Sequence, residues 1–164
     1  MNIIISDTTA LITFAKSDIL SLLDNLFKTV YIPRAVHNEL IFKDDIVKFR
    51  IDKFDKIVLK EVSNFSILET IEKFKIDKGE TEAISLAIEL DLKLIIDEKK
   101  GRQVALSQGV SIVGVLGILI ENYRQDFISF DDAHYYFELV KKNGLRVDIK
   151  LEELFYIKLK QIKE

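Results

Sequence analysis

The residues that decide the fold are Asn2-Ile3-Ile4-Ile5-Ser6-Asp7-Thr8-Thr9-Ala10-Leu11-Ile12. The three consecutive isoleucines are β-branched and predict a short buried strand, which ends where the polar residues begin. In an open parallel sheet, functional groups gather beyond the carboxyl ends of the strands. We therefore expect Asp7 at such a position, either as a functional carboxylate or as the cap of the helix that follows. This stretch alone supports the two roles equally.

The composition predicts one globular domain over residues 1–164 with a substantial core, since 48% of the residues are hydrophobic and 31% are charged. The chain has no cysteine, which excludes disulfides and thiolate metal ligands and favours a cytoplasmic location. No apolar run approaches the ~20 residues of a membrane helix, so we expect no membrane association. The net charge of −3 counts mildly against a broad nucleic-acid-binding face.

Strands are predicted to alternate with helices along most of the chain. Four further apolar segments have the character of strands, at residues 29–32, 56–62, 92–96 and 110–113. The segments between them carry helical periodicity and short connections, which favours a parallel sheet covered on both faces. The α/β fold class follows, with a central parallel sheet of about five strands. Residues 126–164 are expected to form a helical C-terminal extension.

Asp97 repeats the pattern of Asp7, because it directly follows the strand predicted at 92–96. Glu39 lies along or beside the apolar stripe of its helix, where a buried carboxylate would need a partner or a function. The alternative for Glu39 is a solvated position at the edge of that stripe. Glu80 shares the inward face at the start of its helix, although an acid there can also simply stabilise the helix dipole. Further along the same helix, Glu82 and Glu89 are expected to point to solvent.

Asp7, Glu39, Glu80 and Asp97 are predicted to converge at one edge of the sheet. Four carboxylates repel one another strongly unless a cation lies between them. All-oxygen ligands suit Mg²⁺ or Mn²⁺ better than zinc or copper. A divalent ion at the mouth of an α/β sheet indicates phosphate chemistry. Neither His37 nor His134 has the spacing of a metal ligand, and no glycine-rich phosphate loop occurs.

Several segments, taken in order, resemble the PIN-domain nucleases, and in particular the toxin-type PIN-like proteins of prokaryotes that are related to VapC. The resemblance covers roughly residues 1–125. It is carried by Ser6–Ile12, Ile32–Leu40, Gly79–Ala87, Ile95–Arg102 and Gly109–Gly117.

This resemblance implies a three-layer α/β/α fold and a Mg²⁺- or Mn²⁺-dependent ribonuclease. Asp7, Glu39, Glu80 and Asp97 would be its catalytic and metal-binding acids. Thr9 would be a hydroxyl that assists the first acid. Many PIN domains have Asp where this chain has Glu80, whose extra methylene moves the carboxylate outward.

The substrate side of the site leaves two alternatives open. Asp97 or Glu98 could face the metal, and the position at the end of the strand favours Asp97. Lys99, Lys100 and Arg102 are placed either to hold substrate phosphates or to form a solvated helix start. The resemblance also implies an RNA substrate, a small antitoxin partner and a homodimer, as in the toxins of toxin–antitoxin pairs.

Rival functions differ in the residues that they require. A non-catalytic PIN-like module that binds protein or RNA is disfavoured, because all four acids are present. A haloacid-dehalogenase-type phosphohydrolase needs a second Asp two residues after Asp7, where this chain has Thr9. A receiver-type phosphoacceptor needs an acid pair at the end of the first strand, and that pair is absent. Cleavage of DNA instead of RNA stays open, since no residue that would contact a 2′-hydroxyl is identified.

Overall fold

The computed structural model describes residues 2–42 and 45–163, which form five strands and ten helices. The strands are β1 (Ile3–Ser6), β2 (Thr29–Ile32), β3 (Ile57–Leu59), β4 (Leu94–Ile95) and β5 (Ile112–Val113). The helices are α1 (Thr8–Lys16), α2 (Ser21–Asp24), α3 (Arg34–Ile41), α4 (Asp45–Lys53), α5 (Phe65–Glu72), α6 (Lys78–Leu90), α7 (Lys99–Ser107), α8 (Val115–Arg124), α9 (Phe130–Lys142) and α10 (Ile149–Ile162).

The five strands form one parallel sheet in the order β3-β2-β1-β4-β5. The register pairs Ile4 of β1 with Val30 of β2 on one side, and Ser6 with Ile95 of β4 on the other. The predicted α/β class and the five-stranded parallel sheet are confirmed. Strands β3, β4 and β5 are shorter than the apolar segments from which they were predicted.

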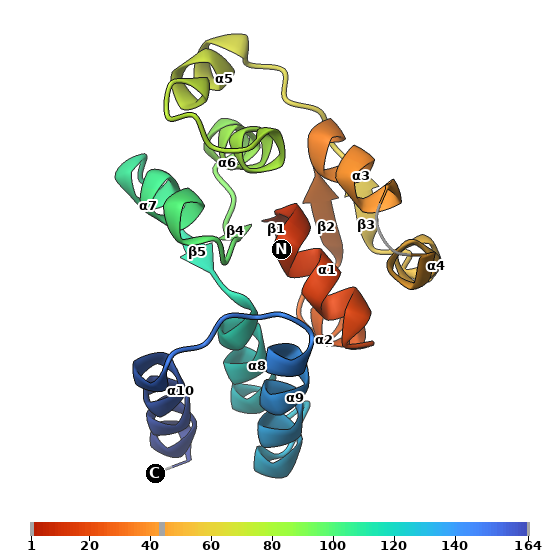
Figure 1. Ribbon diagram of the computed structural model, residues 1–164, viewed down its shortest axis with the longest axis vertical. Coiled ribbons are helices and arrows are strands. Elements are labelled where there is room, and N and C mark those ends of the chain that lie inside the picture. Colours follow the sequence, from red (N-terminus) through yellow and green to blue (C-terminus); the bar gives the residue numbers. More distant parts are fainter. Residues whose placement is uncertain (1, 43–44, 164) are drawn as a thin grey trace.

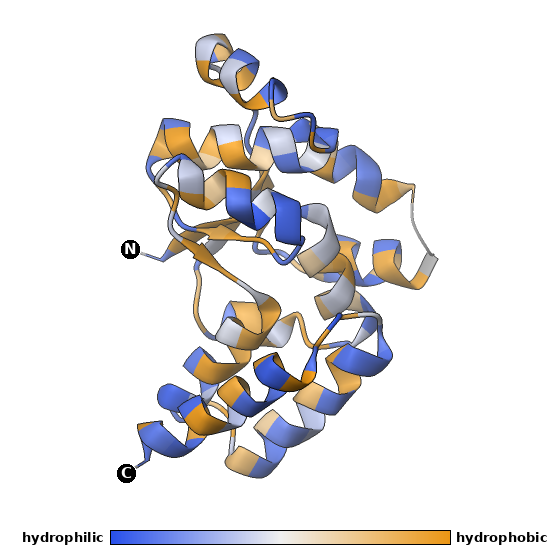
Figure 2. Ribbon diagram, turned by 60° about the vertical axis from the view of Figure 1, so that its left-hand side comes forward, coloured by the Kyte–Doolittle hydropathy of each residue, from blue (hydrophilic) through white to orange (hydrophobic). Residues whose placement is uncertain are grey.

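Strand β1 is the centre of the sheet, because two strands lie on each side of it. Ile4, Ile5 and Ser6 are all buried, as a strand covered on both faces requires. The strands accordingly stand out as hydrophobic within the molecule (Figure 2). The core also takes in large side chains from the helices, such as Phe14 of α1 and Phe137 of α9.

The helices form layers on the two faces of the sheet. Parallel strands are nearly always joined by right-handed crossovers, which puts the helices that join β1, β2 and β3 on one face and the helix that joins β4 to β5 on the other. Helix α6 packs on β1 and β4, and α1 packs on α3 and α4. The C-terminal helices α8, α9 and α10 lie together at one end of the molecule, far from α5 (Figure 1). None of the described helices is long and apolar enough to cross a membrane.

Candidate active site

The candidate site lies where β1 and β4 end side by side. The chain leaves β1 towards β2 and β3, and later returns to the opposite edge of β1 with β4. Such a reversal of strand order opens a crevice at the carboxyl ends of the two strands. The backbone N–H of Asp7 donates to the carbonyl of Ile95 at 3.0 Å. This bond ties the residue after β1 to the last residue of β4, two positions before Asp97.

Asp7 caps the helix that follows β1 and keeps one carboxylate oxygen unpaired. It is the N-cap of α1, and its Oδ1 accepts a hydrogen bond from the Ala10 N–H at 3.0 Å. The residue is only 1% exposed, and its Oδ2 has no hydrogen-bond partner. The cap therefore uses one carboxylate oxygen and leaves the other available in a buried position.

Glu80 lies in the first turn of α6, which Asp77 caps. The Glu80 N–H donates to Asp77 Oδ1 at 2.8 Å. The Glu80 side chain points inward, is 7% exposed and has an Oε2 without a partner. The charge of Asp77 also acts on Asp7 and Glu80, and this residue was not singled out from the sequence. Its signal was present, because an Asp three residues before Glu80 is a typical helix cap.

Asp97 is held at the start of another helix. Its Oδ2 accepts a hydrogen bond from the Val115 N–H, at the first residue of α8, at 3.0 Å. Its Oδ1 lies so near Gly114 that a Cβ on this glycine would come within 2.5 Å. Asp97 is half-buried, whereas the neighbouring Glu98 is exposed. Asp97 is thus held against the start of α8, whereas Glu98 faces solvent.

Glu39 comes from α3 and lies against the start of α6. A Cβ on Gly79 would be 2.8 Å from Glu39 Oε1, so the carboxylate lies beside the residue that precedes Glu80. Glu39 is half-buried. The charges of Glu39 and Asp97 act on Asp7, and the charge of Asp7 acts on Glu80, so the four acids lie near one another.

The electrostatics of this crevice disfavour ionised acids. Burial raises the pKa of Asp7 to about 8; the Ala10 N–H opposes this shift, and the charges of Asp97, Asp77 and Glu39 add to it. Burial also raises the pKa of Glu80 to about 9, with further contributions from a hydrogen bond to the Asp77 side chain and from the charges of Asp77, Asp7 and Glu98. The pKa of Asp97 is raised by burial, against the Val115 N–H and the Arg102 charge.

A divalent cation would offset this repulsion, and the donors available fit Mg²⁺ or Mn²⁺. The four acids supply only oxygen ligands, and two of their buried oxygens, Asp7 Oδ2 and Glu80 Oε2, have no hydrogen-bond partner. No three acidic or histidine side chains in the described residues form a ready-made metal-binding group. Mg²⁺ does not require one, since it keeps several waters and takes only one or two carboxylates directly.

The residues considered for substrate binding have different surroundings. Lys99 and Lys100 are exposed in the first turn of α7. Arg102 is half-buried, and its Nη1 donates to the carbonyl of Ile96 at 2.7 Å, so part of its guanidinium is already engaged. Thr9 is exposed, whereas the hydroxyl of Thr8 is buried without a partner.

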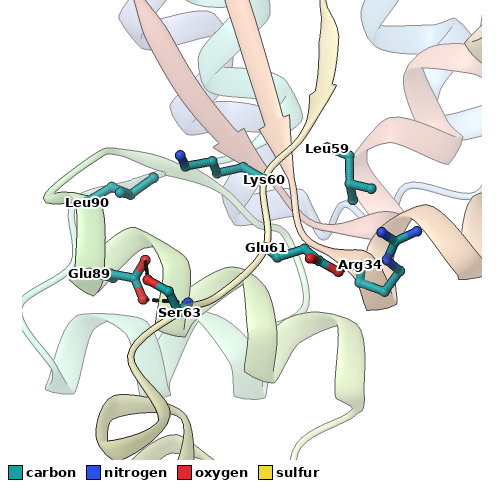
Figure 3. A pocket seen from close by; sticks show the side chains of 7 residues that line it. All are labelled: Arg34, Leu59, Lys60, Glu61, Ser63, Glu89 and Leu90. Carbon is teal, nitrogen blue, oxygen red and sulfur yellow. Dashed lines mark hydrogen bonds and ion pairs between the residues drawn. The ribbon is translucent and has the colours of Figure 1, made fainter.

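The prediction that Glu82 and Glu89 point to solvent is wrong. Glu82 accepts a hydrogen bond from the Ala35 N–H at 2.9 Å, at the start of α3. Glu89 accepts from the N–H and the hydroxyl of Ser63, both at 2.9 Å, and from the Asn64 N–H before α5. Figure 3 shows Glu89 and Ser63 in a pocket beside the end of β3, which none of the four acids lines. Both glutamates satisfy backbone donors that only the tertiary structure brings to them.

Comparison with known proteins places the chain in a family. A family model described as DUF3368, PIN domain, matches residues 3–161. The chain belongs to the PIN-domain family. The match includes the three C-terminal helices as well as the sheet. PIN domains are generally nucleases, in agreement with the resemblance seen in the sequence. No curated protein gives a significant match.

Ten chains in solved structures are similar to this PIN domain. One belongs to the crystal structure of VapBC2 from Rickettsia felis bound to a DNA fragment from their promoter. It has 14% sequence identity and a TM-score of 0.53, and the likeness covers 68% of this chain and 98% of that one. At this level of identity the likeness concerns the fold.

Proposed function

We propose that this protein is a Mg²⁺- or Mn²⁺-dependent endoribonuclease, which hydrolyses phosphodiester bonds of RNA. The observation that carries the proposal is the pair of buried oxygens without hydrogen-bond partners, Asp7 Oδ2 and Glu80 Oε2, at the edge where β1 and β4 end. Buried polar atoms are nearly always paired in folded proteins. Two such atoms in one acidic crevice are explained by a cation and its water.

Asp7, Glu39, Glu80 and Asp97 would hold the metal in this proposal. A bound Mg²⁺ or Mn²⁺ supplies a nucleophilic water and neutralises charge that develops on the phosphate. The Ala10 and Val115 N–H groups fix the carboxylates of Asp7 and Asp97, so these acids are oriented before the metal arrives. The products would carry a 5′-phosphate and a 3′-hydroxyl.

Exposed lysine side chains beside the crevice would hold the substrate. Lys99 and Lys100 lie in the first turn of α7, directly after Asp97 and Glu98. A helix start also attracts phosphate through its free N–H groups. The Thr9 hydroxyl, exposed in the first turn of α1, would assist at Asp7. Arg102 would act mainly on Asp97, because it is anchored on Ile96.

The biological role proposed is that of the toxin of a toxin–antitoxin pair. The sequence resemblance and the similarity of fold to a chain of VapBC2 support this role. A small antitoxin that covers the crevice and a homodimeric toxin complete the proposal. Purification of the protein with and without its gene neighbour, followed by a mass measurement in solution, tests both parts.

The first experiment is cleavage of an end-labelled, single-stranded RNA pool by the purified protein. We expect cleavage with Mn²⁺, none with EDTA and none with Asp7→Asn. Asp24→Asn is the matched control, because it changes an exposed acid of α2 and should cut like the unaltered protein.

Calorimetry with Mn²⁺ completes the test. An unaltered protein that neither cuts RNA nor binds Mn²⁺ would overturn the nuclease proposal in favour of a non-catalytic module that binds protein or RNA. Binding of Mn²⁺ without cleavage of RNA would redirect the search to DNA substrates.

A further inference from the structure

Gly101 makes an unusually close approach to one acid of the site. A Cβ placed on Gly101 would lie 2.0 Å from Glu80 Oε2 and 3.1 Å from Glu80 Cδ. Two non-bonded heavy atoms cannot approach to 2.0 Å, because carbon and oxygen atoms repel well outside that distance. The position of the Glu80 carboxylate therefore requires a residue without a side chain at position 101.

The backbone gives no other reason for glycine at this position. Gly101 lies in the first turn of α7 and has helical geometry that any residue can adopt, unlike Gly109, whose φ is +78°. Glycine is less favourable than alanine inside a helix, because it loses more conformational entropy on folding. The close contacts with Glu80 Oε2 and with Ile96 Cδ1, which a Cβ would meet at 2.0 Å and 2.8 Å, explain it, and the contact with Glu80 is the closer one.

The contact matters because Glu80 has little freedom to move elsewhere. Its side chain is only 7% exposed, so buried neighbours limit the positions that its carboxylate can take. A Cβ on residue 101 would displace the carboxylate from the wall formed by α7. Two other acids show the same kind of contact, Glu39 with Gly79 and Asp97 with Gly114.

We propose that Gly101 is a positioning residue, which leaves the space that the long Glu80 side chain needs to keep its carboxylate in the metal site. The part of this inference that concerns the metal rests on the proposed function. The packing relation between Gly101 and Glu80 does not. An Asp at position 80 would have a shorter side chain and withdraw from α7, so it would not need the space.

The first test measures Mn²⁺ affinity by calorimetry for four proteins: the unaltered chain, Gly101→Ala, Glu80→Asp, and the two substitutions combined. We expect Gly101→Ala to weaken binding about tenfold or more in the presence of Glu80, as loss of a supporting contact does in other metal sites. The same substitution should change the affinity less than about twofold when it is added to Glu80→Asp. Gln103→Ala, an exposed position on the same helix, is the control and should have no effect.

The second test needs no metal. It compares the effect of Gly101→Ala on the melting temperature in the unaltered chain and in Glu80→Ala. We expect Gly101→Ala to lower the melting temperature by about 3 °C more with Glu80 present than in Glu80→Ala. The added Cβ would also meet Ile96 Cδ1, at 2.8 Å, in both backgrounds, so this contact cancels from the comparison.

The outcomes separate the two proposals. The role of Gly101 would be overturned by two results together. Gly101→Ala would change the Mn²⁺ affinity equally in the unaltered chain and in Glu80→Asp, and it would change the melting temperature equally in the unaltered chain and in Glu80→Ala. If the unaltered protein bound no Mn²⁺, the proposed function would fail. The melting temperatures would then still decide whether Gly101 accommodates Glu80.

Discussion

Glu80 and Glu89 lie near opposite ends of one helix, α6, in opposite surroundings. Burial raises the pKa of Glu80 to about 9, and no donor faces its Oε2. At Glu89, burial also acts to raise the pKa, but hydrogen bonds from Asn64 and Ser63 outweigh it and the pKa is lowered. A carboxylate that meets backbone donors supports the fold. A buried carboxylate without donors destabilises the fold as long as no cation is bound, which makes it a candidate for function.

The largest effect should appear when the two glutamates are compared in catalysis. Glu80→Gln keeps the shape of the side chain and removes the charge that would face the metal. We expect a loss of RNA cleavage of roughly 10²–10³-fold, measured with Mn²⁺ at saturation. Glu89→Gln should stay within about twofold of the unaltered protein, because its site is remote from the crevice. Similar losses in both variants would remove the distinction between the two glutamates.

Glu80 and Glu89 should also have opposite effects on the stability of the metal-free protein. Asp7 and Glu80 keep their protons in the folded protein up to pKa values of about 8 and 9, whereas both ionise near pH 4 in the unfolded chain. Between these limits the folded state binds more protons than the unfolded state. The free energy of unfolding must therefore fall as pH rises from about 4 to about 9.

Thermal melts of the metal-free protein at pH 5 and pH 8 measure this effect. We expect Glu80→Gln to raise the melting temperature at pH 8 by about 5 °C and to reduce the fall between the two pH values. Glu89→Gln should lower the melting temperature at pH 8, because a neutral amide accepts hydrogen bonds from Ser63 and Asn64 more weakly than a carboxylate does. A melting temperature of Glu80→Gln below that of the unaltered protein at pH 8 would contradict the argument.

The smallest effect concerns the exposed lysines near each glutamate. Lys100 lies beside the crevice, and Lys60 lies in the pocket beside Glu89 (Figure 3). If RNA follows the crevice, Lys100→Gln should weaken RNA binding about threefold and lower the slope of log affinity against log salt by about 0.7. Lys60→Gln should leave both unchanged. Titration of a labelled RNA with the metal-free protein at several salt concentrations measures the two quantities, and equal slopes for both variants would exclude the proposed path.

Local pattern was sufficient to predict the sheet and the ends of its two central strands. Strand β2 was predicted with the bounds that the structure has, and Asp7 and Asp97 were placed at the correct edge, because the end of a buried strand is visible as an abrupt change from apolar to polar residues. Glu80 was placed on the inward face from helical periodicity alone. The strand ends and the inward face of a helix could be predicted because they follow from residues that are close together in the sequence.

The features that could not be predicted depend on contacts between distant segments. Glu82 was assigned to solvent because its own helix says nothing of Ala35, 47 residues away, whose N–H it accepts. The contact of Gly101 with Glu80 depends likewise on how α7 lies against α6. The bond from Arg102 to the carbonyl of Ile96 is local in the sequence, but periodicity does not state which atom a long side chain meets. Periodicity states which side of a helix faces inward, but not which atoms it meets there.

The central position of β1 has a consequence for the order in which the protein can be made. Of the five strands of this sheet, β1 is synthesised first, and its neighbour β4 follows only about 90 residues later. Asp97 therefore cannot approach Asp7 until β4 has been synthesised. Until then, the edge of β1 that will pair with β4 stays unpaired. A chain that is released before residue 94 can bury Asp7 against β2 at most. Incomplete chains would lack the crevice, so the proposed activity would belong only to molecules whose translation has passed β4.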